Sequence, residues 1–289
     1  MQVPDPLLEG HRYLCYRASR TRGSSQPWSP HRLPFCWTSS GRDCPNTYHE
    51  MTATGDMSSR RSRSVPLDGG LNGLEDLSTA SVANAIETFT VRNRNDGFIG
   101  GEVRCRFPEL QPMVGRALTV KVSSPKAADP EVNRYWEMWE QLEQFTAPSV
   151  LVMQNIGGDP SRCAYFGEVM ATLALRLAAT GLVTDGGVRD LSAVRRLGFQ
   201  CFSRYVTPSH GNFQIIEVGV PVVIGGQKIC SGDVLHGDED GVVIVPESLV
   251  PNLRAAVLRV EGQETELMEH VRGSDFDLKS TQRIRQEWD

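Results

Sequence analysis

Arg189 and Asp190 stand side by side at a point where an apolar segment gives way to a predicted helix. The guanidinium group of an arginine binds a carboxylate through two parallel hydrogen bonds. The carboxylate of an aspartate is a hard oxygen ligand of the kind that Mg²⁺ prefers. The pair could therefore bind a small carboxylic acid and a metal ion together. The simpler alternative is a surface ion pair in which the aspartate caps the helix.

A second candidate segment begins another predicted helix at Gly167 and Glu168. The first N–H groups of a helix have no partner inside it, and together with the helix dipole they attract anions. Glu168 brings a second carboxylate, although an acid at the start of a helix often does no more than interact favourably with the helix dipole. The two segments follow the predicted strands 149–153 and 182–184. If those strands are parallel neighbours, their carboxyl ends meet at one edge of the sheet and the two segments face each other.

The spacing of apolar residues predicts the elements that position these segments. Alternation over residues 113–123 predicts a half-buried strand with Thr119 on its polar face, and continuous apolar runs predict strands buried on both faces. Asp129-Pro130 predicts a helix start, and Gly181 predicts the end of the helix that follows Glu168. The predicted helices are 76–86, 129–142, 168–180, 190–197 and 247–271, and the predicted strands are 113–123, 149–153, 182–184, 201–206, 215–218, 220–224 and 242–245.

This order of elements predicts an α/β fold with a mixed sheet, in which parallel crossovers lie in the middle and antiparallel strands follow Gly211. We expect one folded domain over residues 71–275 and a C-terminal tail over 276–289. Residues 1–70 are rich in Arg, Ser and Pro and poor in acids, and we expect a disordered extension. An organelle-targeting leader and a true start at Met51 or Met57 are the alternatives.

Composition narrows the class of protein. The chain has 289 residues and a formal net charge of −5, which argues against a nucleic-acid partner because such partners favour a basic face. It contains no apolar run of 18 residues, so we expect no membrane span. Seven cysteines without a CxxC pair fit reduced thiols better than a disulfide framework. We therefore expect a cytoplasmic protein, unless residues 1–70 direct it to an organelle.

Four segments together carry a resemblance to a known family. They are LSTASVANAI, VGRALTVKV, GEVMATLALRLAATGLVTDGGVRD and SGDVLHGDEDGVVIVP, in this order along the chain. With them the chain resembles the RraA-like family over roughly residues 72–250. That family includes the class II 4-hydroxy-4-methyl-2-oxoglutarate / 4-carboxy-4-hydroxy-2-oxoadipate aldolases. It also includes non-catalytic regulators that bind and inhibit an RNA-degrading enzyme.

The resemblance implies a β/β/α swivelling domain that assembles as a homotrimer or hexamer. It implies a small 2-oxo acid as substrate, cleavage to pyruvate, decarboxylation of oxaloacetate and a divalent metal, usually Mg²⁺. Arg189 matches the arginine that binds substrate, and Asp190 matches the aspartate that binds the metal. Glu168 matches an acid that binds the metal through water. The backbone amides that would hold the substrate fall on Gly167, Glu168, Val169 and Met170.

Two departures bear on the activity that the resemblance implies. The aldolases carry an acid three residues after the Arg-Asp pair, where this chain has Ala193. They also draw an acid from the C-terminal helix of a neighbouring subunit, for which Glu264, Glu261 and Glu266 are candidates here. The regulators of the family lack the aspartate that Asp190 provides, so its presence favours an enzyme. A regulator and a dedicated decarboxylase remain the alternatives.

Other reactive side chains form weaker candidates. His210 and His236 follow predicted strands without the paired spacing of zinc ligands, so we expect structural or exposed histidines. Cys163 and Cys201 have no histidine partner near in sequence, which argues against a thiol nucleophile. The acids of Asp238–Asp240 predict a tight hairpin turn. The glycine pairs do not form GxGxxG, so the sequence gives little support for a bound nucleotide.

Overall fold

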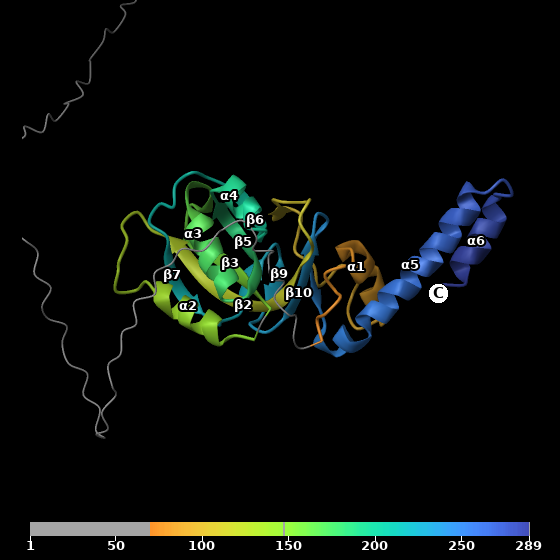
Figure 1. The fold of residues 1–289 in the computed structure, drawn as a ribbon, viewed down its shortest axis with the longest axis horizontal. Helices are drawn as coiled ribbons and strands as arrows, with labels where there is room; N and C mark the ends of the chain where they lie inside the picture. The colour runs from red at the N-terminus through yellow and green to blue at the C-terminus, as the bar shows by residue number, and fades with distance from the viewer. Residues whose placement is uncertain (1–69, 147, 289) are drawn as a thin grey trace, which may run out of the picture. The chain divides into compact units, whose positions relative to one another are not determined.

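The computed structural model describes residues 70–146 and 148–288, and a mixed sheet lies at its centre (Figure 1). Within these residues the sheet has nine strands, seven of them in the order β1-β6-β5-β3-β2-β10-β11, while β4 pairs with β5 and β7 with β2. The strands are β1 Arg104–Cys105, β2 Met113–Ser124, β3 Ser149–Gly158, β4 Ala164–Phe166, β5 Ala179–Val188, β6 Gln200–Val206, β7 Gln214–Val218, β10 Val234–Asp238 and β11 Gly241–Val245. Strands β2 to β6 pair in parallel and the remaining pairs are antiparallel, which confirms the predicted mixed sheet.

Helices and a small hairpin cover the sheet (Figure 1). Apolar side chains of α2, α3 and α4 pack on one face, against β2, β3 and β5. The hairpin of β8 and β9 packs on the other face, and α1 and α5 pack against β10 and β11. These elements are α1 Thr79–Glu87, α2 Tyr135–Gln144, α3 Glu168–Arg176, α4 Leu191–Arg196, α5 Val250–Arg272, α6 Leu278–Gln286, β8 Val222–Ile224 and β9 Gln227–Ile229.

The predicted strands and the first helix are present, but β3 runs on to Gly158 where 149–153 was predicted, and β5 spans Ala179–Val188 where only 182–184 was predicted. Ser78 caps α1 by accepting a hydrogen bond from the Ser81 N–H, so the cap is Ser78 and not Asp76. Thr119 differs from the prediction because both faces of β2 are covered at its position. Its side chain is fully buried, and its hydroxyl donates to the Val220 carbonyl at 2.6 Å.

The second helix begins later than predicted. The segment at Asp129-Pro130 forms a turn, and α2 starts at Tyr135. The carboxylate of Asp129 accepts a hydrogen bond from the Glu131 N–H at 3.0 Å, and such local bonds compete with helix formation. Trp139 of α2 is buried in the core, whereas Trp136 is 69% exposed.

The third helix ends earlier than predicted, and the prediction that Gly181 closes it is wrong. Helix α3 ends at Arg176, and Ala178 turns the chain with a φ of 63°. Gly181 lies inside β5, between β3 and β6. A Cβ atom there would lie 2.5 Å from Met113 Sδ and 2.8 Å from the Gln200 carbonyl. Sheet pairing has overridden the helical preference of this apolar segment, and its close packing requires a glycine.

The C-terminal part forms two helices. Helix α5 begins at Val250, after a short 3-10 turn over Glu247–Leu249, and α6 lies within the segment expected as a tail. In the described part of the chain, no helix combines the length and the apolar character needed to cross a bilayer. The extension expected over residues 1–70 lies outside the described residues but for its last position.

Candidate functional site

Two helix starts meet at the carboxyl ends of β4 and β5. The short strand β4 leads directly into α3, and β5 leads through Arg189 and Asp190 into α4. The two strands are parallel, and the Arg189 N–H donates to the Phe166 carbonyl at 3.0 Å. Asp185-Gly186-Gly187 therefore belongs to β5 and does not form a turn after it. The predicted meeting of the two segments is present, although β4 and not β3 brings them together.

Asp190 joins the two helix starts. One oxygen of its carboxylate, Oδ2, accepts a hydrogen bond from the Glu168 N–H at 3.2 Å and lies 3.4 Å from Nε of Arg189. Its backbone is left-handed, with a φ of 57°, a conformation that aspartate and asparagine tolerate better than most residues. The side chains of Arg189 and Asp190 are 36% and 41% exposed. Both groups therefore remain accessible to a ligand.

Gly167 leaves room for this contact. It precedes α3 and has no side chain to cap the helix, so the carboxylate of Asp190 takes that place. A Cβ atom at Gly167 would lie 2.6 Å from Asp190 Oδ2 and 3.0 Å from Arg189 Cγ. Its φ of −159° is ordinary extended backbone, so the requirement for glycine here is one of space.

A cavity of about 330 Å³ lies beside the two helix starts. Arg189 and Gly167 line it together with two further predicted residues, the exposed Val169 and the buried Met170. The remaining lining residues were not predicted from the sequence, and most are aromatic or apolar: Tyr135, Ala164, Tyr165, Phe166, His210 and Phe213. For Tyr165 and Phe166 the sequence offered an indication that they lie at the site, because they directly precede the predicted substrate segment.

The carboxylates at this place would suit a hydrated magnesium ion better than a zinc ion. Within residues 70–146 and 148–288, no three His, Cys, Asp or Glu side chains are grouped closely enough to hold a metal. A closed zinc site needs about four such ligands, whereas Mg²⁺ keeps several waters and binds proteins through one or two carboxylates. Asp190 and the exposed Glu168 at the start of α3 provide two carboxylates of that kind.

The weaker candidates differ in their surroundings. His236 is fully buried between Thr79, whose hydroxyl lies 2.9 Å from Nδ1, and the Leu74 carbonyl, 2.9 Å from Nε2, and burial lowers its pKa. His210 is exposed and lines the cavity, with Nδ1 2.7 Å from the Gly211 carbonyl. Burial raises the pKa of the Cys163 thiol to about 11, which makes it a poor nucleophile at neutral pH.

Asp185 is a partly buried carboxylate near the end of β5. It accepts a hydrogen bond from the Asn155 N–H at 2.6 Å, beyond the point where regular pairing between β3 and β5 ends. Burial raises its pKa to about 6, although this hydrogen bond and the positive charge of Arg204 act in the opposite direction. It thus links β3 to β5, the strand that leads into Arg189.

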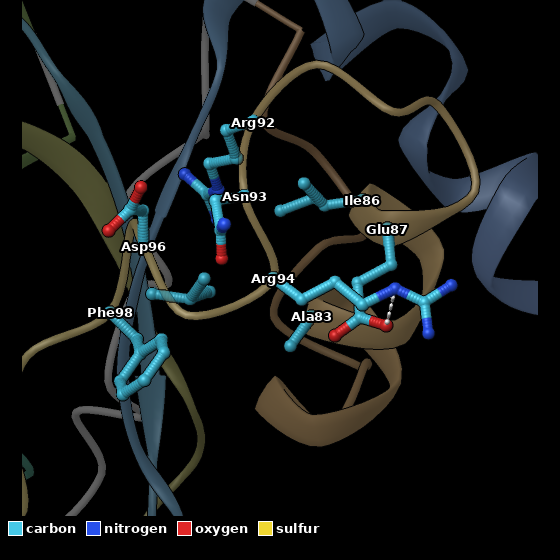
Figure 2. Close-up of a pocket in the computed structure, with 9 residues that line it drawn as sticks. Ala83, Ile86, Glu87, Arg92, Asn93, Arg94, Asp96 and Phe98 are labelled. Atoms are coloured by element: carbon cyan, nitrogen blue, oxygen red, sulfur yellow. Dashed lines mark ion pairs between the residues drawn. The ribbon is translucent and has the colours of Figure 1, made fainter.

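Other hollows lie elsewhere in the described residues. The one in Figure 2 lies between α1 and β11, where Arg94 and Glu87 form an ion pair at 3.4 Å. Its volume of about 30 Å³ suits one or two water molecules and not a substrate.

Glu264 of α5 lies in a larger hollow, where it accepts a hydrogen bond from the Asn84 amide at 3.0 Å within the same chain. Of the three candidates for reaching a neighbouring subunit, Glu264 thus has a partner in its own chain.

Comparison with known proteins agrees with this architecture. A curated relative from Halalkalibacterium halodurans, named "Putative 4-hydroxy-4-methyl-2-oxoglutarate aldolase", is 31% identical over 146 residues. The match covers 50% of this chain and 65% of the relative, so the chain spans slightly less than two thirds of that relative's length.

Two solved structures share the fold. An uncharacterised protein from Pseudomonas syringae is similar with a TM-score of 0.59 and 25% identity, over 80% of this chain and all of that one. RraAS2 of Streptomyces coelicolor, described as an unusual member of the RNase ES inhibitor RraA protein family, gives a TM-score of 0.56 at 25% identity. That likeness covers 70% of this chain and 99% of RraAS2. The model of the RraA-like family, described as Aldolase/RraA, matches residues 79–244, and the chain belongs to this family.

Proposed function

We propose that the chain is a divalent-metal-dependent lyase that cleaves 4-hydroxy-2-oxo acids to pyruvate and also decarboxylates oxaloacetate. The observation that supports this most directly is the contact of Asp190 Oδ2 with the Glu168 N–H and with Nε of Arg189. It joins a cation, a carboxylate and a helix N-terminus, and of these Arg189 and the start of α3 line the cavity. The name of the Halalkalibacterium halodurans relative supports an aldolase at modest identity.

In this proposal Arg189 binds the carboxylate of the 2-oxo acid. Its guanidinium lies at the cavity and is partly exposed, so a carboxylate can approach it in the plane of its N–H groups. The N–H groups at the start of α3, on Val169 and Met170, lie at the positive end of the helix dipole. They would bind the carbonyl oxygen or the second carboxylate oxygen of the pyruvyl group.

Both reactions break a bond at C3 and leave negative charge on the pyruvyl group as its enolate. Arg189 and the N–H groups of α3 are held in place before the reaction, so they stabilise this charge without reorganisation. A divalent ion, with Mg²⁺ as our candidate, would be held by Asp190 with Glu168 binding through water, and it would supply Lewis-acid stabilisation of the same charge.

The two reactions differ in their need for a base. Aldol cleavage requires removal of the proton of the 4-hydroxyl group, and we propose a water held by Glu168 for this step. Loss of CO₂ from oxaloacetate needs no such base, so one site can support both reactions. Because Ala193 stands where the related aldolases carry an acid, we expect decarboxylation to be the stronger activity.

A second candidate function is that of an RraA-type regulator, favoured by the likeness to RraAS2. The two candidates differ in whether the chain turns over a substrate. The test gives oxaloacetate to the full chain with and without Mg²⁺ and follows the release of pyruvate. We expect release that depends on Mg²⁺ and that falls at least a hundredfold in Arg189→Ala. An absence of release from the wild-type chain would remove the lyase and favour the regulator.

A further inference from the structure

The two halves of the candidate site are carried by different strands, which pair over a short length. Strand β4 leads into α3, and β5 leads into the Arg-Asp pair and α4. Two residue pairs, Ala164 with Gly187 and Phe166 with Val188, define the register between β4 and β5. The position of the start of α3 relative to the Arg-Asp pair therefore depends on the other contacts that β4 makes.

Strands β3 and β5 separate just before this place. Their pairing ends at Met153 and Thr184, and β3 then continues beside β2 to Gly158 while β5 continues beside β4. Beyond the separation, the Asn155 N–H donates to the Asp185 carboxylate at 2.6 Å and bridges the two strands. Contacts beyond this point determine how the ends of β3, β4 and β5 lie relative to one another.

Tyr165 of β4 contacts both of the separating strands. Its side chain is fully buried, and a Cβ atom at Gly186 would collide with its ring, so the ring lies directly against the backbone of β5. Its hydroxyl donates to the side-chain oxygen of Asn155, on β3, at 2.5 Å. Burial raises the pKa of Tyr165 above its ordinary value of 10, so the hydroxyl keeps its proton at neutral pH and remains the donor.

From these contacts we infer that Tyr165 is a positioning residue, whose ring and hydroxyl fix the start of α3 relative to Arg189 and Asp190. It acts through the backbone, because the next residue, Phe166, accepts a hydrogen bond from the Arg189 N–H at 3.0 Å and is followed by Gly167, which precedes α3. The inference rests on the proposed function, since it concerns the joint binding of a substrate by Arg189 and the N–H groups of α3.

The variant Tyr165→Phe removes the hydroxyl and keeps the ring, and its KM for oxaloacetate provides the test. Without the bond to Asn155, β4 and the first N–H groups of α3 can move relative to Arg189. We expect KM to rise about tenfold in the full chain with Mg²⁺, because a misplacement of about 1 Å costs up to about a hundredfold in efficiency. A smaller folded fraction would lower the apparent kcat and leave KM unchanged, so KM separates positioning from stability.

Thr119→Val is the matched control for the loss of a buried hydrogen bond. The hydroxyl of Thr119 is also fully buried and donates to the Val220 carbonyl at 2.6 Å, but it lies on β2. We expect this variant to have a lower melting temperature, as Tyr165→Phe does, and to keep the wild-type KM. A rise in KM of the same size in Thr119→Val would overturn the inference.

Asn155→Ala removes the same contact from its partly exposed partner, so the test does not depend on the folding of Tyr165→Phe. We expect the same rise in KM. The double variant should show no more than the larger single effect, because both substitutions remove one interaction. An unchanged KM in either single variant, or additive effects in the double variant, would overturn the inference and leave the lyase intact. If the wild-type chain releases no pyruvate from oxaloacetate, the proposed function fails and the inference fails with it.

Discussion

Gly167 and Asp190 show how single residues create the site. The carboxylate of Asp190 lies so close to the Gly167 backbone that residue 167 has no room for a side chain. The same carboxylate caps α3 and contacts Arg189, while the backbone of Asp190 precedes α4. One left-handed residue thus fixes the positions of the cation and of the helix N-terminus relative to each other.

A methyl group at Gly167 is expected to abolish most activity with little loss of stability. In Gly167→Ala the added Cβ collides with Asp190 and Arg189 and displaces both, and small displacements of catalytic groups lower rates about a hundredfold. The φ of Gly167 suits alanine, so we expect the free energy of unfolding to change by no more than about 1 kcal/mol. Pyruvate release and urea denaturation measure the two effects. Gly101→Ala, where a Cβ meets no atom within 4 Å, is the control, and equal activity of both variants would contradict this role.

Ala193 offers a test of the balance between the two proposed reactions. It lies on α4, one turn after Asp190, and is partly exposed. In Ala193→Glu an acid returns to the position that the related aldolases use, so we expect the ratio of aldol cleavage to decarboxylation to rise several-fold. Both rates are measured as pyruvate released from 4-hydroxy-2-oxo acids and from oxaloacetate. An unchanged ratio would show that the residue at position 193 does not influence which of the two reactions the site favours.

At the scale of elements, strand β5 carries the site and contains an acid whose protonation affects stability. Asp185 has a pKa of about 6 in the folded chain, above its ordinary value of 3.8, because burial disfavours its charged form. The folded state therefore binds more protons than the unfolded state between these values. Stability contributed by this group falls as the pH rises from about 4 to 6, and the loss is complete above pH 6.

Replacement of Asp185 by asparagine is expected to remove this pH dependence. The amide oxygen of Asp185→Asn can still accept the hydrogen bond from the Asn155 N–H. Relative to the wild-type chain, the variant should gain stability between pH 4 and pH 7, by at most about 3 kcal/mol for a shift of roughly two pKa units. Urea denaturation at a fixed protein concentration measures the difference. A difference that is constant with pH would show that Asp185 titrates normally.

The elements also show what sequence patterns can predict. The alternation in β2, the short apolar runs in β3 and β5 and the Arg-Asp pair after β5 are visible because burial and chemistry leave local signals. Strand β4 spans three residues, too few for a periodic pattern, yet it brings α3 beside Asp190. The turn at Ala178 lacks a glycine, so the end of α3 could not be read from composition. The aromatic residues Tyr135, Phe166 and Phe213, which line the cavity, come from distant parts of the chain that only the fold can bring together.

At the scale of the whole molecule, we propose that the C-terminal helices take part in assembly. Helices α5 and α6 extend beyond the contact with α1 (Figure 1), and they and the segment between them carry exposed apolar side chains, namely Leu258, Met268, Val271, Phe276 and Leu278. Exposed apolar groups such as Met268 and Val271, on neighbouring turns of α5, favour contact with another subunit. We expect light scattering to give the mass of three or six chains. Met268→Glu should lower that mass, and a wild-type monomer would contradict the proposed assembly.

In the proposed lyase, the carboxylate of Asp190 makes pyruvate release dependent on a divalent ion. Its most direct test compares Mg²⁺-dependent pyruvate release by the wild-type chain and by Asp190→Asn, because asparagine tolerates the left-handed backbone with a φ of 57° and removes only the charge. Asp240→Asn, at the exposed turn between β10 and β11, is the matched control. We predict that Asp190→Asn loses at least about a hundredfold in kcat/KM with an unchanged melting temperature, while Asp240→Asn keeps full activity. Mg²⁺-dependent release that persists in Asp190→Asn at the wild-type rate would contradict the claim.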